Sequence, residues 1–403
     1  MRILVNYLPA LKQRSGIGHY TAEVCRNLEL MGLELDLFPP ADWQKTFNRL
    51  AFLWNSNRQK SASDGSSTLV RKVFSWGKSL ARQSLRQAYS FAFSRRASDK
   101  GHDLYFEPNF LPLETGLPTV ATIHDLGVFK NPSWHPADRV REFEKRFTRA
   151  VKTCKHFLTG SESVKKEMVE VLGIPSEKIT VTYNGIRQGL KPLPMPVTRA
   201  LLREMKLPPR YFLHIGTVEP RKNLLFLMKA YCQLPAKIRD QYPLLLVGGW
   251  GWNAQEESRF FEKTARHQGV VLSGYIPDDK IPAVYNGARA LLFPTHYEGF
   301  GFPTVEMMAC GGPVIASRIG VNIEIAGGKA CLVDLDDQAG WTEAMNRMAL
   351  DDDWRAQLVK GVRENAARFT WVACAKKTFS AFQIALGQNQ DKSLGYSHQR
   401  LAG

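Results

Sequence analysis

Two carboxylates bracket a glycine-rich turn in the stretch Glu298-Gly299-Phe300-Gly301-Phe302-Pro303-Thr304-Val305-Glu306. A short apolar strand precedes the turn, and Pro303 suits the start of a helix, where a missing backbone N–H costs nothing. The free N–H groups at such a start attract phosphate, and glycines let a ligand approach the backbone closely. The stretch therefore predicts a site for a ligand that carries both a diphosphate and hydroxyl groups, as a nucleotide sugar does.

Two adjacent cations, Arg221 and Lys222, follow a strand expected over residues 211–216. Fixed cations at this place can neutralise a diphosphate leaving group. The alternative is a solvated basic pair at a helix start, which the positive end of the helix dipole would disfavour unless an anion lay nearby. The pair therefore indicates an anion site at the end of this strand.

The pair His124-Asp125 ends a strand expected over residues 119–123. Ligands of open parallel sheets bind outside the carboxyl ends of the strands, so the pair points into a cleft. A lone pair of this kind is usually structural.

Gly16 and Gly18 follow the first strand and could place backbone amides against phosphates. A dinucleotide fingerprint needs a third glycine where Thr21 stands, although Asp36 lies near the end of the next strand, as a ribose-binding acid would. A nicotinamide-dependent dehydrogenase is therefore an alternative, but it leaves residues 298–306 unexplained.

The chain alternates strand-like apolar runs with amphipathic helices, which is typical of doubly wound α/β proteins, and its 403 residues suit two domains. A proline-rich linker is expected over residues 191–196. We predict these units: a first domain over 1–190, a second over 197–370, a last helix over 371–387 and a polar, disordered tail over 388–403.

Four blocks together resemble the retaining glycosyltransferases of family 4, which have the GT-B fold: residues 15–21, 122–126, 216–223 and 274–317, the last containing the Glu-x7-Glu motif. The resemblance extends over most of the chain, from Met1 to about Asp337. It implies two Rossmann-like doubly wound domains that face each other across a cleft. The first would bind the acceptor and the second the nucleotide sugar, with the last helix crossing back to the first domain.

The resemblance also implies roles for single residues. His124 would lie near the reacting sugar, Arg221 and Lys222 would contact the diphosphate, and Glu306 would reach the ribose. Glu298 would hold sugar hydroxyls together with the amides around Gly299, Phe300, Gly301 and Phe302. Gly16, Gly18 and Gly216 would line the donor site. The implied catalytic set is His124, Arg221, Lys222 and Glu298.

The implied reaction is glycosyl transfer with retention at the anomeric carbon and without a metal, because cations already stand where a metal would act and no Asp-x-Asp motif accompanies the site blocks. The amino-acid sequences of the blocks resemble those of bacterial mannosyltransferases of polysaccharide assembly. This resemblance favours GDP-mannose as donor and a saccharide or lipid-linked saccharide as acceptor. Departures at Phe302 and at Ile323-Glu324 weaken this choice of sugar. A UDP-sugar donor and a noncatalytic sugar- or membrane-binding scaffold are the alternatives.

A formal charge of +16 is concentrated between residues 41 and 100. On a helical wheel, residues 71–96 form an amphipathic basic helix. Its apolar face would hold Val73, Phe74, Trp76, Leu80, Ala88 and Phe91, opposite Arg71, Lys78, Arg82 and Arg86. This face could dock on the first domain, or it could contact an anionic membrane or a lipid-linked acceptor. No nucleic-acid-binding motif accompanies the charge, so we expect no nucleic-acid partner.

No apolar run reaches the length of a membrane span, and the first apolar run is too short for a signal peptide. We expect a cytoplasmic protein, with peripheral contact to the cytoplasmic face of the inner membrane as an option. The six cysteines are scattered without metal-site spacing, which predicts buried free thiols and no metal site.

Overall fold

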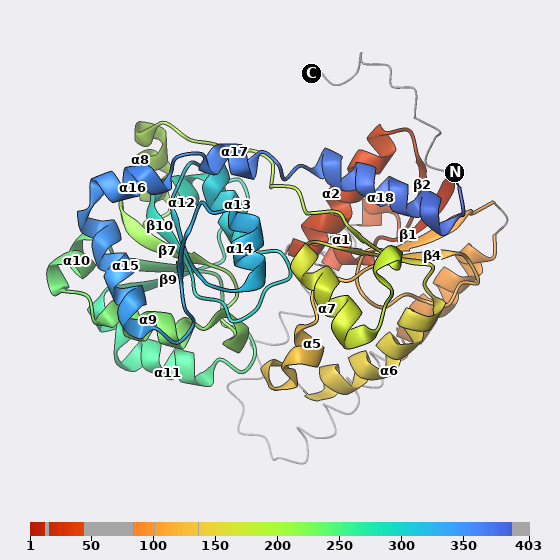
Figure 1. The fold of residues 1–403 in the computed structure, drawn as a ribbon, viewed down its shortest axis with the longest axis horizontal. Helices are drawn as coiled ribbons and strands as arrows, with labels where there is room; N and C mark the ends of the chain where they lie inside the picture. The colour runs from red at the N-terminus through yellow and green to blue at the C-terminus, as the bar shows by residue number, and fades with distance from the viewer. Residues whose placement is uncertain (13–15, 44–83, 85, 100, 136, 389–403) are drawn as a thin grey trace.

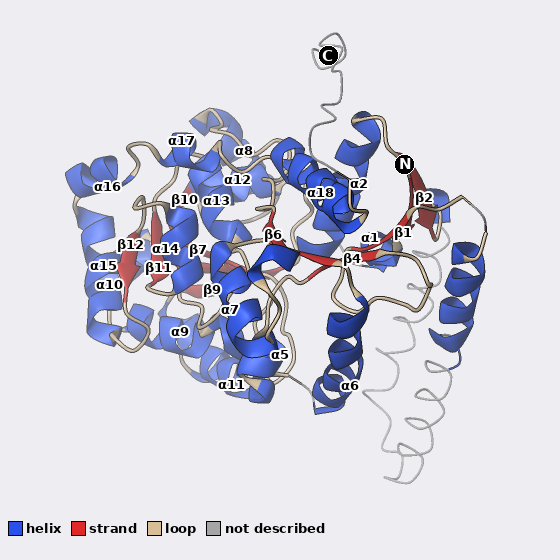
Figure 2. Cartoon of the chain, turned by 45° about the vertical axis from the view of Figure 1, so that its right-hand side comes forward, coloured by secondary structure: helices blue, strands red, loops and turns tan. Residues whose placement is uncertain are grey.

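The computed structural model describes residues 1–12, 16–43, 84, 86–99, 101–135 and 137–388. It contains two six-stranded parallel sheets, ordered β2-β1-β3-β4-β5-β6 and β12-β11-β10-β7-β8-β9. Figure 1 shows the two halves side by side, and Figure 2 shows helices packed around both sets of strands. The prediction of two doubly wound domains is confirmed.

The strands are near-continuous apolar runs because helices cover parallel sheets on both faces. In the first strand, for example, Ile3, Leu4 and Val5 are fully buried. The main elements of the first domain are β1 (Arg2–Asn6), α1 (Leu8–Lys12), α2 (Gly16–Leu30), β2 (Glu34–Phe38), β3 (Leu104–Glu107), β4 (Thr119–Thr122), α5 (Gly127–Lys130), α6 (Ala137–Thr153), β5 (His156–Thr159), α7 (Glu162–Leu172) and β6 (Ile179–Val181).

The second domain repeats the same alternation, and the chain then returns to the first. Its main elements are α8 (Met195–Glu204), β7 (Tyr211–Ile215), α9 (Leu224–Cys232), α10 (Ala236–Gln241), β8 (Leu244–Val247), α11 (Gln255–Lys263), β9 (Val270–Gly274), α12 (Ile281–Gly287), β10 (Ala288–Phe293), α13 (Phe302–Ala309), β11 (Val314–Ser317), α14 (Gly320–Ala326), β12 (Cys331–Val333), α15 (Gln338–Leu350), α16 (Asp352–Leu358) and α17 (Val362–Ala366), followed by α18 (Trp371–Ala385).

Helix α18 packs on the first domain, beside α2 and against β4 and β5 (Figure 1). Its Phe382 ring meets the Phe106 ring of β3, with centroids 5.2 Å apart. The chain thus crosses between the domains before α8 and again before α18. The two crossings are joined by a hydrogen bond from the N–H of Ile186 to the carbonyl of Phe369, 3.1 Å long. Helix α8 already begins at Met195, inside the proline-rich segment.

The basic segment is described only from residue 84 onward, apart from residue 85, so the predicted positions Arg71 to Arg82 lie outside the described residues, as does the tail over 389–403. Residues 86–97 are helical. The docking alternative is wrong for this end of the predicted apolar face, because Phe91 is 71% exposed and Ala88 is exposed as well.

The face that packs on the first domain carries Tyr89, Phe93 and Ala97, which are spaced four residues apart. Phe93 is fully buried, and its ring centroid lies 5.0 Å from that of Tyr105 in β3. The wheel grouped the apolar residues over 71–96, whereas within residues 86–97 the side chains that point inward follow this four-residue spacing. None of the helices in the described part of the chain is both long and apolar enough to span a membrane.

Candidate active site

The loops after β7 and β10 bring together three of the predicted catalytic side chains: Arg221, Lys222 and Glu298. The Lys222 ammonium donates to Oε1 of Glu298, and Nη1 of Arg221 lies 2.9 Å from the same oxygen. The hydroxyl of Thr295 lies 3.1 Å from it. One carboxylate oxygen therefore faces two cations, all within the second domain.

Burial makes this cluster electrostatically strong. Lys222 is 8% exposed and Glu298 is 9% exposed, so the alternative of a solvated basic pair is wrong. Burial alone would raise the pKa of Glu298, but Arg221 and Lys222 outweigh it and hold this pKa at about 2. Burial lowers the pKa of Lys222 against the opposing effect of Glu298. The carboxylate therefore stays ionised throughout the physiological range.

A second carboxylate balances the remaining charge. Oε1 of Glu219 accepts hydrogen bonds from Nε and Nη2 of Arg221, at 3.2 and 2.8 Å. These carboxylates outweigh the effect of burial and raise the pKa of Arg221. The cluster thus sets two cations against two carboxylates. The role of Glu219 was not predicted, because Glu219 was read only as part of a turn.

Two glycines of the motif have distinct structural reasons. Gly301 precedes α13 with φ of 85°, in the left-handed region that favours glycine. A β-carbon on Gly299 would lie 1.9 Å from the carbonyl oxygen of His124, which belongs to the other domain. Helix α13 begins at Phe302, so Pro303 is its second residue. The motif therefore lies directly against the His124 loop of the other domain.

The phenyl rings of the motif are packed away from solvent or against neighbours. Phe300 is 5% exposed, and its ring centroid lies 5.2 Å from that of Phe302 and 5.5 Å from that of Phe369. The polar groups that these two residues can offer a ligand are their backbone amides. The expected contact of those amides with sugar hydroxyls stays a prediction.

Glu306, at the far end of the motif, has different partners. It is 3% exposed, accepts a 2.7 Å hydrogen bond from the hydroxyl of Tyr285, and lies 3.3 Å from Nε of Arg187. Arg187 also pairs with Asp278 at 2.6 Å, and Asp278 lies 3.3 Å from Nε2 of His19 in α2. Arg187 comes from the segment between the domains, and no spacing in the sequence pointed to it.

His124 faces the motif from the end of β4. Its Nε2 lies 2.8 Å from the carbonyl oxygen of Pro108, which can only accept, so Nε2 carries the proton. Burial lowers the pKa of His124 against the opposing effects of Pro108 and Asp125. The imidazole is therefore neutral, and Nδ1 is its hydrogen-bond acceptor.

The glycines that were expected to line the donor site lie on both sides of the cleft. Gly16 and Gly18 lie in the first turn of α2, and their expected contact with the donor phosphates stays a prediction. A β-carbon on Gly16 would lie 3.2 Å from the ring of Phe302. Gly216 follows β7 with φ of 149°, and its N–H donates to Val247 at 2.8 Å. Gly16 therefore faces the first residue of α13.

Asp36, the candidate ribose acid of the dehydrogenase alternative, is engaged elsewhere. Arg96 donates to both of its oxygens, at 2.8 and 3.1 Å, and Nε2 of His102 lies 2.8 Å away. These bonds fasten the helix over residues 86–97 to the sheet. The dehydrogenase alternative loses the residue on which it depended.

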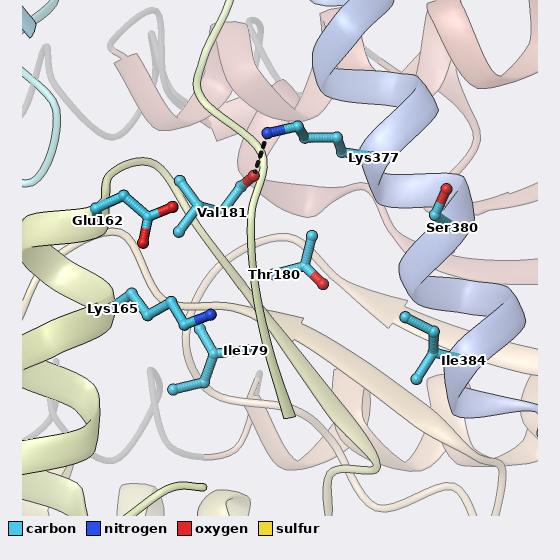
Figure 3. Close-up of a pocket in the computed structure, with 8 residues that line it drawn as sticks. All are labelled: Glu162, Lys165, Ile179, Thr180, Val181, Lys377, Ser380 and Ile384. Atoms are coloured by element: carbon cyan, nitrogen blue, oxygen red, sulfur yellow. Dashed lines mark hydrogen bonds between the residues drawn. The ribbon is translucent and has the colours of Figure 1, made fainter. Parts of the chain in front are cut away.

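A surface hollow of about 310 Å³ lies apart from these residues, between α7, β6 and α18 (Figure 3). Lys377 of α18 reaches across it and donates to the carbonyl of Val181 at 3.1 Å. The lining contains none of the predicted site residues. The candidate active site is therefore the surface where the motif of the second domain faces the His124 loop of the first.

Comparison with known proteins places the chain among the glycosyltransferases. Residues 14–188 match the sequence model of Glycosyltransferase Family 4, and residues 203–365 match that of Glycosyl transferases group 1. The chain is 29% identical over 390 residues to O-antigen chain mannosyltransferase B of Escherichia coli, covering 95% of this chain and all of that protein. It is 25% identical over 345 residues to the serotype-specific mannosyltransferase WbdA of Escherichia coli, covering 81% of this chain but 42% of that longer protein.

The fold has a solved counterpart in Anabaena Alr3699/HepE, crystallised with UDP and glucose. The TM-score is 0.67 at 17% identity, and the match covers 95% of this chain and 99% of that one. This likeness shows the GT-B fold. The two family models together span most of the chain, one on each domain, and the chain therefore belongs to the family 4, or group 1, glycosyltransferases.

Proposed function

We propose that this glycosyltransferase moves mannose from GDP-mannose to a hydroxyl of a saccharide or lipid-linked saccharide acceptor, with retention at the anomeric carbon, in the biosynthesis of a cell-surface polysaccharide such as lipopolysaccharide O-antigen or exopolysaccharide. The choice of sugar is supported by relatives named as mannosyltransferases, one of which is covered over its whole length by 95% of this chain. The choice of reaction rests on one observation above others: two cations, the half-buried Arg221 and the buried Lys222, lie beside Glu298.

The pair matters because negative charge grows on the leaving diphosphate in the transition state. A diphosphate in front of α13 would give Arg221 and Lys222 a new anionic partner. Glu298 would then be free to accept hydrogen bonds from hydroxyls of the sugar. Cations already present in the fold would do the work of a metal, so we propose a metal-independent reaction.

The first domain contributes neutral groups. Nδ1 of His124 can accept a hydrogen bond from a sugar hydroxyl, because Nε2–H is held by Pro108. The front-face route then needs no protein nucleophile. The bond from the anomeric carbon to the diphosphate breaks, the acceptor oxygen bonds to that carbon on the same face, and its proton passes to the departing diphosphate.

A thermal-shift screen tests the donor first, because a ligand that binds the folded state raises the melting temperature. Purified protein is heated with GDP, UDP, ADP, NAD and the corresponding sugar nucleotides, with and without magnesium. We expect selective stabilisation by GDP and GDP-mannose without magnesium. Selective stabilisation by UDP would instead assign a UDP-sugar donor, and a requirement for magnesium would contradict the metal-independent route.

The anomeric configuration of the product tests the mechanism separately. Transfer from GDP-α-mannose should give an α-mannoside, which proton and carbon NMR of the product distinguish from a β-mannoside. A β-linked product would overturn the retaining assignment without changing the donor.

We further infer that the basic segment over residues 41–100 contacts an anionic membrane surface. The support is its concentration of cations and the outward position of Phe91, which is 71% exposed on the helix over residues 86–97. Binding to vesicles that contain phosphatidylglycerol should weaken as salt rises, since salt screens the attraction. Equal binding to neutral vesicles, or none to either, would contradict this inference.

A further inference from the structure

Tyr297, the residue immediately before Glu298, has hydrogen-bond partners in both domains. Its carbonyl oxygen accepts a hydrogen bond from Nη1 of Arg221 at 2.8 Å and lies 2.9 Å from the hydroxyl of Thr295. The backbone of Tyr297 therefore belongs to the charged cluster of the second domain. Its side chain is 8% exposed and lies among residues of the first domain.

The hydroxyl of Tyr297 makes two hydrogen bonds to the first domain. It accepts the backbone N–H of Leu126 at 2.7 Å and lies 2.6 Å from Oε2 of Glu167 in α7, to which it donates. Leu126 is two residues beyond His124 in the same loop. One hydroxyl thus connects the loop that carries His124 to the residue that precedes Glu298.

The ring of Tyr297, like its hydroxyl, contacts side chains of the first domain. The ring of Trp134 stacks on it with centroids 6.4 Å apart, and the ammonium of Lys130 lies 5.5 Å from its centroid. Lys130 also pairs with Glu167 at 2.6 Å. Three side chains of the first domain therefore fix both the plane of the ring and the direction of the hydroxyl.

We propose that Tyr297 is a positioning residue for glycosyl transfer, whose hydroxyl sets where the His124 loop of one domain stands relative to Glu298 of the other. It acts through the N–H of Leu126 and does not touch the sugar. The inference rests on the proposed transfer reaction, but not on which sugar nucleotide is the donor.

The variant Tyr297→Phe tests this role because it keeps the ring and removes only the hydroxyl. We expect kcat to fall about 10- to 100-fold, since small misplacements of reacting groups have effects of this order. The dissociation constant for GDP should change less than about threefold, because the cations and Glu306 are untouched. A wild-type kcat, or equal losses in kcat and in nucleotide affinity, would overturn the proposal.

A matched control is Tyr231→Phe, which removes another buried hydroxyl of the second domain. That hydroxyl lies 3.1 Å from the carbonyl of Tyr242, away from the His124 loop. We expect a lower melting temperature but an unchanged kcat. A similar fall in kcat for both variants would mean that any lost buried hydroxyl slows transfer, which would contradict a positioning role for Tyr297.

A double-mutant cycle with His124→Ala separates positioning from general stability. If Tyr297 acts through the His124 loop, Tyr297→Phe should cost much less kcat in the His124→Ala background than in the wild type. An equal loss in both backgrounds would overturn the proposal. Should Tyr297→Phe fail to fold, Glu167→Ala removes the acceptor of the hydroxyl; an unchanged kcat in that variant would overturn the proposal as well.

The donor assignment and this inference fail in different ways. If wild-type protein does not use GDP-mannose, the donor proposal is wrong. The variants are then compared with the wild type on the sugar nucleotide that it does use. The role of Tyr297 is tested only by the ratio of kcat in each variant to kcat in the wild type.

Discussion

The two sides of the cleft hold their polar groups by different means. On the second domain, Arg221, Lys222 and Glu298 are charged and paired with one another, with Lys222 and Glu298 buried and Arg221 half-buried. On the first domain, His124 is neutral and is fixed by a backbone carbonyl and by the edges of the rings of Tyr20 and Phe110, with centroids 4.9 and 5.4 Å away. The second-domain side can therefore stabilise a change in the charge of a ligand, whereas the first-domain side can hold a hydroxyl of the ligand in place.

Hydrogen bonds join the two sides. The hydroxyl of Ser161 donates to the carbonyl of Gly299 at 2.7 Å. Glu324 of α14 accepts hydrogen bonds from the backbone of Glu162 and Ser163, at 2.7 and 2.9 Å, and so caps the start of α7 in the other domain. Each side is thus built within its own domain, but the complete site depends on these contacts. The following predictions test that division.

The largest effect is expected on the charged side. Lys222→Ala removes one of the two cations that would face the diphosphate, and kcat should fall by about 10²- to 10³-fold, as when other fixed stabilisers of a transition-state charge are removed. Circular dichroism checks that the variant is folded, and Lys166→Ala, at an exposed ion pair with Glu170, is the control. Near-normal turnover by folded Lys222→Ala protein would refute the role given to Lys222.

The next effect concerns the place where the sides touch. Gly299→Ala puts a β-carbon 1.9 Å from the carbonyl oxygen of His124, so the two loops must separate. We expect kcat/KM to fall by about 10²-fold, because the reacting groups are displaced. The control is Gly249→Ala, where a β-carbon meets no atom within 4 Å. Equal activity of the two variants would show that the contact at Gly299 is not needed.

A smaller effect is expected from pH on the charged side. Burial, reinforced by Lys222, lowers the pKa of His214 from 6.5 to about 4. Between about pH 6.5 and pH 4, His214 therefore binds a proton in the unfolded chain but not in the folded chain. The free energy of unfolding falls as pH drops through this range.

The variant His214→Asn isolates this contribution. Between about pH 7 and pH 5, the wild type should lose about 2 kcal/mol more free energy of unfolding than the variant. Urea denaturation at the two pH values measures the difference. Identical pH dependence of the two proteins would mean that the pKa of His214 is the same in the folded and unfolded states.

The smallest effect is expected at the rim of the contact. The indole N–H of Trp252 donates to the carbonyl of Trp134 across the domains at 2.7 Å. Trp252→Phe should weaken this contact by about 1 kcal/mol and lower kcat/KM by about fivefold. Trp341→Phe removes an indole bond within the second domain, to Asp334 at 3.1 Å, and should lower stability while leaving kcat unchanged. The reverse pattern would contradict the division between the two regions.

Local patterns of apolar residues in the sequence predicted most of the helices and strands. The strand expected over residues 119–123 is β4, the strand expected over 211–216 is β7, and the last helix expected over 371–387 is α18. Such runs are informative because a strand covered on both faces must be apolar along its whole length. The helical wheel did not predict which face of the helix over residues 86–97 packs against the sheet, and Ala88 and Phe91 lie on the exposed face.

Sequence order also predicted which residues of the second domain would meet. Arg221 and Glu298 each follow a parallel strand, and the carboxyl ends of such strands share one edge of the sheet. No comparable rule pointed to Arg187 or Tyr297. Their partners, Glu306 and Leu126, are distant in the sequence and become neighbours only when the two domains pack together.

The sequence by itself determined two α/β domains and a phosphate-favouring motif, because strand periodicity, helix starts and glycine positions are local properties of the chain. Only the tertiary structure decided that Glu298 is held by two cations, that His124 is neutral, and that Tyr297 joins their loops. Those properties depend on burial and on distances between segments that are far apart in the chain, and neither quantity is set until the domains fold and meet.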